Sequence, residues 1–114
     1  MNALEVARLA ARAAGARKAL RVVLQDLRGL SDVCSFQLIC SGTSDRQTKA
    51  ICQGIEETLK EHAKTRPIAV EGRQNGHWIL LDYGATIIHV FNKDIRDYYA
   101  IDELWPAAKA IDVG

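Results

Sequence analysis

The feature that most constrains the fold is a pair of apolar runs of strand length, Trp78–Asp82 and Thr86–Phe91, joined by a turn at Tyr83 and Gly84. So short a connection containing a glycine predicts a β-hairpin. Because side chains alternate between the faces of a strand, the first run presents large groups on both. One face carries Trp78, Leu80 and Asp82, and the other carries Ile79, Leu81 and Tyr83. Helices must cover at least one face. If the other face is also covered, Trp78 is a core residue, and if that face is open, Trp78 belongs to a contact surface.

Three further apolar runs predict strands, at Leu20–Leu27, Phe36–Ser41 and Ile68–Glu71. The first two should be antiparallel neighbours, because the break at residues 28–32 is too short for a helical crossover. Both runs are apolar on consecutive as well as alternate positions. That pattern predicts a central part of the sheet that is covered on much of both faces.

Helical spacing predicts a helix at each end of the chain. Near the N-terminus four apolar residues share one side: Leu4, Ala7, Ala11 and Ala14. After Asn92 the pattern turns helical again and continues to Pro106. The N-terminal stretch is rich in alanine and arginine, as organellar transit peptides are. Glu5 and the strand that follows directly favour a first helix of the domain instead.

The longest helix is predicted between the second and third strands. Ser44 can cap it, and Gln47 can complete a capping box. Its buried stripe is expected at Ile51, Ile55 and Leu59, with Cys52 and His62 beside the stripe and Pro67 at the end. Together these patterns predict one α/β (α+β) domain over residues 1–114, in which helices flank a mixed five-stranded sheet.

Charge and composition exclude several classes of function. The net charge of +1 gives little attraction to a nucleic acid backbone. No apolar run reaches the ~18 residues of a membrane-spanning helix, so we expect no membrane partner. The three cysteines, Cys34, Cys40 and Cys52, are odd in number and form no C-x-x-C motif, which predicts reduced thiols and a cytoplasmic location. The histidines share no ligand spacing with them, so we expect neither a metal nor another cofactor.

No pair of residues suits catalysis. A nucleotidyl transferase would hold magnesium with two carboxylates on one strand, but Asp82 has no acidic residue at the alternate positions beside it. The Ser-Gly-Thr-Ser turn at residues 41–44 lacks a Walker lysine, which favours a capped turn over an anion site. His89 alternates with apolar residues along its strand, which favours packing over acid–base chemistry.

Aromatic residues gather between residues 77 and 105, which include both tryptophans and all three tyrosines. Tryptophan and tyrosine are enriched in protein–protein interfaces. Base rates for tryptophan favour the core for Trp78, but Tyr98, Tyr99 and Trp105 lie in a short tail that can bury only one side. Some of these aromatics should therefore remain accessible and form a patch.

Several runs of residues stand in a distinctive order and spacing: DLRGLSDVC at 26–34, ICSGTSDRQ at 39–47, VEG at 70–72, WILLDYG at 78–84, HVF at 89–91, and RDYY at 96–99 followed by Leu104-Trp105. In these runs the chain resembles the ribosomal silencing factor family, also called Iojap-like proteins. The resemblance extends from the first predicted helix to Trp105.

The resemblance implies a function without turnover. Members of this family bind the large ribosomal subunit through its protein fourteen and block joining of the small subunit, which silences translation when nutrients are short. The family fold looks like a nucleotidyltransferase core without the catalytic residues. Carried over residue by residue, the contact surface is expected at Trp78, Leu81, Asp82, Tyr83, His89, Arg96 and Tyr98.

The chain departs from the family pattern at residues 35–37, at Ala85 and at Pro106, which affects contact details. Two alternatives to the binding function stay open. A nucleotidyltransferase-like enzyme would need a second acid near Asp82. A self-associating scaffold or homodimer would use the apolar hairpin face and the strand edges.

Overall fold

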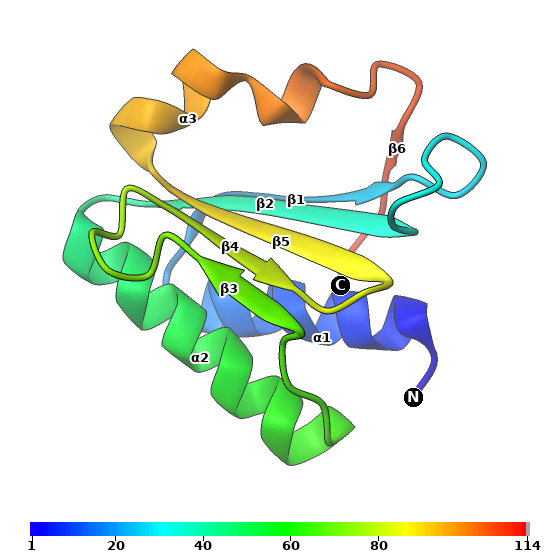
Figure 1. Ribbon diagram of the computed structural model, residues 1–114, viewed down its shortest axis with the longest axis horizontal. Helices are drawn as coiled ribbons and strands as arrows, with labels where there is room; N and C mark the ends of the chain where they lie inside the picture. The colour runs from blue at the N-terminus through cyan, green and yellow to red at the C-terminus, as the bar shows by residue number, and fades with distance from the viewer. Residues whose placement is uncertain (114) are drawn as a thin grey trace.

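The computed structural model describes residues 1–113 and shows a sheet between two unequal layers (Figure 1). The helices are α1 (Ala3–Ala16), α2 (Asp45–Ala63) and α3 (Lys93–Tyr99), followed by a 3-10 turn η1 (Ile101–Glu103). The strands are β1 (Leu20–Asp26), β2 (Phe36–Gly42), β3 (Ala69–Glu71), β4 (Trp78–Asp82), β5 (Thr86–Asn92) and β6 (Lys109–Ala110). None of the described helices is both long and apolar enough to cross a membrane.

The sheet is mixed and has the strand order β3-β4-β5-β2-β1-β6. The predicted hairpin of β4 and β5 and the predicted antiparallel pair of β1 and β2 are both confirmed. Only β2 and β5 run parallel, at the centre of the sheet. The prediction of five strands is wrong by one, because β6 has two residues, both exposed, and no apolar pattern marks it.

The main core lies between the sheet and the pair of helices α1 and α2. Small residues of α1, including Ala10 and Ala14, are fully buried and let this helix approach closely. The predicted stripe of α2 is confirmed, since Ile51, Ile55 and Leu59 are all fully buried. Apolar side chains on one face of β2, β4 and β5 complete this core: Leu38, Cys40, Ile79, Leu81, Ile88 and Val90.

Details at the ends of α2 differ from the prediction. Ser44 caps the helix as expected, with its hydroxyl accepting from the Gln47 N–H at 3.1 Å. The Gln47 side chain accepts from the N–H of Thr43 rather than that of Ser44, so the expected capping box is displaced by one residue. The helix ends at Ala63, where Lys64 turns left-handed with φ 54°, before the chain reaches the expected stop at residue 67. His62 is exposed and not part of the buried side, because its side chain faces solvent on the last turn of α2.

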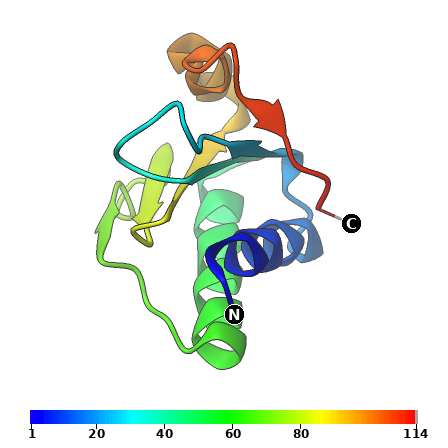
Figure 2. The same ribbon diagram turned by 90° about the vertical axis from the view of Figure 1, so that its right-hand side faces the viewer.

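After β5 the chain crosses the opposite face of the sheet. α3, η1 and the segment that leads to β6 form a C-terminal strap, defined as residues 93–110, on the side away from α1 and α2 (Figure 1). Figure 2 shows the chain then descending along the β1 edge toward α1. There Arg8 and Arg12 donate hydrogen bonds to the backbone carbonyls of Asp112 and Val113.

A buried arginine holds the strap on the sheet. Arg96 is 1% exposed, and its guanidinium donates to both carboxylate oxygens of Asp102, at 3.1 and 2.6 Å. It also donates to the Ser41 hydroxyl at 3.0 Å and to a backbone carbonyl of β1 at 2.7 Å. Gln25 extends this network, because it donates to the Asp102 carbonyl and accepts from Gln37. The strap therefore rests on a paired and hydrogen-bonded charge, which a buried guanidinium requires.

Candidate protein-docking site

The strap leaves part of its face of the sheet open. Six side chains of β4 and β5 point to this side, and we call them the hairpin face: Trp78, Leu80, Asp82, Ile87, His89 and Phe91. The strap packs over β5, β2 and β1, whereas Trp78, Leu80 and Ile87 remain partly exposed. This uncovered strip of large apolar groups makes the hairpin face a candidate docking surface.

Trp78 lies at the centre of an aromatic cluster. Its ring centroid is 4.9 Å from that of Phe91 and 4.7 Å from that of Tyr99 on the strap. Tyr98 meets Tyr99 edge-on at 5.1 Å and is itself 82% exposed. Trp78 is thus both part of the packing that holds the strap and part of the accessible surface, and Tyr98 is the most exposed aromatic beside it.

His89 is a packing residue within this cluster. It is 6% exposed, and its Nδ1 accepts a hydrogen bond from the Trp78 Nε1–H at 3.1 Å. Burial lowers the pKa of His89 to about 4, and the charge of Asp102 opposes that shift only in part. The ring is therefore neutral at pH 7, in agreement with its role as an acceptor.

Three of the expected contact residues are inside the molecule. Leu81 is fully buried toward α1 and α2, Arg96 is 1% exposed beneath the strap, and His89 is covered by Trp78. These side chains cannot form surface contacts in this structure, which corrects that part of the expectation. The resemblance implied a contact role for Arg96, and no local pattern marks the partners that bury this side chain.

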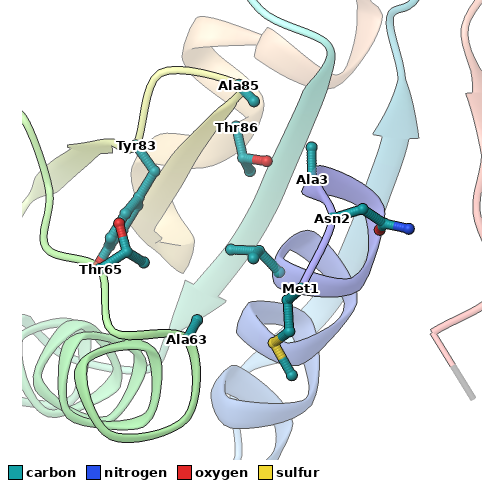
Figure 3. Close-up of a pocket in the computed structure, with 9 residues that line it drawn as sticks. Met1, Asn2, Ala3, Ala63, Thr65, Tyr83, Ala85 and Thr86 are labelled. Atoms are coloured by element: carbon teal, nitrogen blue, oxygen red, sulfur yellow. The ribbon is translucent and has the colours of Figure 1, made fainter.

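Tyr83 lies away from Trp78, on the side of the main core. Figure 3 shows its ring reaching toward Thr65 at the end of α2, across a cavity of about 240 Å³ from Met1. Its hydroxyl is buried and has no hydrogen-bond partner among the described residues. Burial, with a smaller contribution from the charge of Glu56, raises the pKa of Tyr83. The Tyr83 and Trp78 rings therefore do not belong to one flat contact surface.

Asp82 ends β4 on the hairpin face and is partly exposed. Its carboxylate accepts from the Gly84 N–H at 2.8 Å, which stabilises the turn. Across residues 1–113 there is no group of three or more histidine, cysteine or acidic side chains placed to hold a metal ion.

The sheet also has a topological switch point, the place where open α/β sheets commonly bind ligands. β2 and β5 are parallel neighbours, and the helices that follow them, α2 and α3, lie on opposite faces. The gap between their ends is filled by the chain itself, because Asp45 accepts from Asn92 at 2.9 Å and lies 3.0 Å from the His77 imidazole. A carboxylate at the N-terminus of α2 disfavours an anion there, so the turn at 41–44 is better explained as a helix cap.

The sequence patterns did not predict two exposed apolar residues near the far end of the hairpin face. Val33 and Leu104 are 82% and 59% exposed, and both lie in segments that the patterns assigned to a turn and a helical tail. The sequence offered one signal, because Val33 is a large apolar residue in a polar turn. That signal points to a site only once Val33 and Leu104 are known to line the same cavity.

Comparisons with known proteins agree with one another. The family model described as "Ribosomal silencing factor during starvation" matches residues 1–114. The ribosomal silencing factor RsfS of Bacillus subtilis is 34% identical over 113 residues, which are 99% of this chain and 95% of that protein. A crystal structure of a Chromobacterium violaceum protein has a TM-score of 0.89 and 32% identity over 96% of this chain and 90% of its own. A mouse protein named "Mitochondrial assembly of ribosomal large subunit protein 1" is 31% identical over 73 residues, 61% of this chain and 32% of that protein.

Proposed function

The chain belongs to the ribosomal silencing factor family, and from that premise we propose that it represses translation by occupying the large ribosomal subunit. The surface feature that supports this proposal is the open hairpin face with Tyr98 beside it. Large apolar and aromatic groups of this kind form the centres of protein–protein interfaces. The names of the relatives point to the ribosome as the partner, and to its large subunit in the mouse protein.

The proposed partner is protein fourteen on the intersubunit face of the large subunit, and the proposed mechanism is steric. A chain that covers this face prevents the small subunit from joining, so no bond is made or broken. A protein partner suits the near-neutral net charge of +1, which gives little attraction to ribosomal RNA. The site of action would be the cytoplasm, and no cofactor is required.

The enzyme alternative has less support. We regard the sheet and its helices as a nucleotidyltransferase-like core that has lost its chemistry, because Asp82 is a single carboxylate engaged in its own turn. Magnesium-dependent turnover of a nucleotide by the purified protein would contradict this assignment.

Sucrose gradients test the proposal. The protein should co-sediment with isolated bacterial large subunits and should reduce the fraction of joined ribosomes when small subunits are added. Unchanged joining at excess protein would refute the repressor function.

Tyr98→Ala should weaken large-subunit binding about tenfold without loss of fold, because the side chain is exposed and aromatic. A matched Glu61→Ala variant on the far side of α2 should bind like wild type.

Self-association is favoured by a separate observation. β3 forms one of the two edges of the sheet, and Ile68 beside it is 75% exposed, so this edge could pair with a second copy. Sedimentation equilibrium decides this point. A monomer mass at every concentration would exclude a homodimer, whereas a dimer that dissociates on large subunits would show that self-association and ribosome binding compete.

A further inference from the structure

A cavity opens at the end of the hairpin face farthest from Tyr98. It has a volume of about 230 Å³ and lies between the loop after β1 and the segment after η1. Its walls are mainly apolar. Ser31 and Gln37 are the polar lining residues, and the others are Leu27, Val33, Cys34, Ile87, Leu104 and Trp105. Ile87 belongs to both the hairpin face and the cavity, so the cavity continues the candidate docking surface.

The size and exposure of this cavity suit a protruding side chain. Small-molecule sites usually enclose ~300–1,000 Å³, and this cavity lies below that range. Val33 and Leu104 line it while 82% and 59% of their surface is exposed. Exposed aliphatic groups around an apolar cavity favour an apolar side chain from a partner, because that side chain would remove Val33 and Leu104 from contact with water.

The charges next to the lining residues in the chain are mainly negative, because the one cation among them, Arg28, is paired with Asp26 at 2.8 Å. Asp32 precedes Val33, and Glu103 precedes Leu104, and both acids are exposed. Asp82 lies close enough to the Cys34 thiol to raise its pKa, although burial is the larger cause of that shift. Among the described lining residues there is no lysine or arginine. This potential repels phosphate groups and attracts basic protein segments.

We propose that the cavity binds an apolar side chain carried on a basic segment of a large-subunit protein. The inference rests on the proposed function and deepens it, because it names the chemistry of the contact and places that contact between the loop at residues 27–34 and the strap. Burial of Leu104 and Val33 supplies the affinity, and the acidic rim orients the partner and speeds its approach.

Cys34 reports directly on the occupation of this cavity. It is partly exposed, whereas Cys40 and Cys52 are buried, so a thiol reagent should label Cys34 selectively in the folded protein. The wild-type protein is alkylated at slightly alkaline pH, free and bound to isolated bacterial large subunits, and the Cys34 peptide is quantified by mass spectrometry. Binding should slow labelling by about tenfold or more, because an occupied cavity opens to the reagent only when the complex opens. Equal labelling rates in the free and bound protein would overturn the proposal.

Variants test the same contact without the thiol. Leu104→Asp and Val33→Asp place a charge at the cavity and should each weaken large-subunit binding by about 30-fold. Gln53→Asp is the matched control, because Gln53 is exposed on α2, on the other side of the sheet. It should bind like wild type. An equal loss in all three variants would show that the contact is not specific to the cavity.

Neutralising the rim tests the charge of the partner. Asp32→Asn together with Glu103→Gln should weaken binding about fivefold at low salt, and the difference should shrink at high salt. Unchanged or tighter binding would exclude a basic segment. The outcomes also separate the two proposals: if wild type binds large subunits while the variants bind equally and Cys34 stays reactive, only the cavity contact is wrong. If wild type does not bind, both fail.

Discussion

In the Trp78–His89 pair, burial favours a neutral imidazole, and the neutral ring can accept the hydrogen bond of the indole. The imidazole accepts from the indole N–H at 3.1 Å, and protonation at Nδ1 would remove that acceptor within a buried cluster. The pattern of alternating residues predicted a packed histidine, and its burial confirms this. What the pattern could not show is the partner, because Trp78 and His89 lie on different strands and meet only through the register of the hairpin.

Stability should therefore depend on pH through His89. Its pKa is about 4 when folded and 6.5 in an ordinary environment, so below pH 6.5 the unfolded chain binds the proton more readily. Neutral His89 contributes fully to the free energy of unfolding above pH 6.5. This contribution, on the order of 3 kcal/mol, is lost as the pH falls toward 4. Chemical denaturation of wild type and His89→Gln across this range measures the slope. The slope should be smaller in His89→Gln and unchanged in His62→Gln, and equal slopes in all three proteins would contradict this origin.

At the scale of elements, the strap depends on a buried ion pair. The pattern after Asn92 predicted a helix behind β5, and α3 confirms it, although the helix ends at Tyr99 and not near Pro106. The helix is too short to be stable alone, so its position depends on what lies beneath it. Arg96 and Asp102 supply that anchor. The pKa of Asp102 is lowered, since the hydrogen bonds and charge of Arg96 outweigh the effect of burial, which would raise it.

Removing the charge of one partner should lower the free energy of unfolding more than replacing both partners with apolar residues. Asp102→Asn leaves the Arg96 guanidinium buried without its counter-charge, which should destabilise the protein by about 3 kcal/mol. The double variant Arg96→Met with Asp102→Leu removes both charges and should lose less than Asp102→Asn alone. Urea unfolding of the single and double variants gives the coupling energy. Additive losses would show that the two residues act independently.

At the scale of the whole molecule, the two faces of the sheet are held differently. The face toward α1 and α2 is closed by an apolar core, whereas the strap rests on the network of Arg96, Asp102, Gln25 and Gln37. The side chains of the strap itself are mostly exposed or only partly buried, although Ile39 and Phe91 on the sheet beneath it are fully buried. The strap should be the less stable layer.

Hydrogen exchange should reveal this difference. Amides of residues 94–104 should exchange through an opening of the strap at a free energy well below that of global unfolding, while those of β2 and β5 should exchange only on global unfolding. Native-state exchange in increasing denaturant separates the two processes. If the strap and the central strands exchange at one common free energy, the molecule is a single cooperative unit and this prediction is wrong.

Local sequence patterns specify the other strands but not β6, and they also specify the alternation of side chains on the hairpin and the family. These follow from local periodicity and from motifs in fixed order, which do not depend on distant contacts. Only the tertiary structure decided which face of the hairpin stays open, that Arg96 is buried, and that Val33 and Leu104 share a cavity. Burial is a property of segments that meet in space. The path of the strap across β5, β2 and β1 is set by bonds between residues up to 77 positions apart, which no local pattern records.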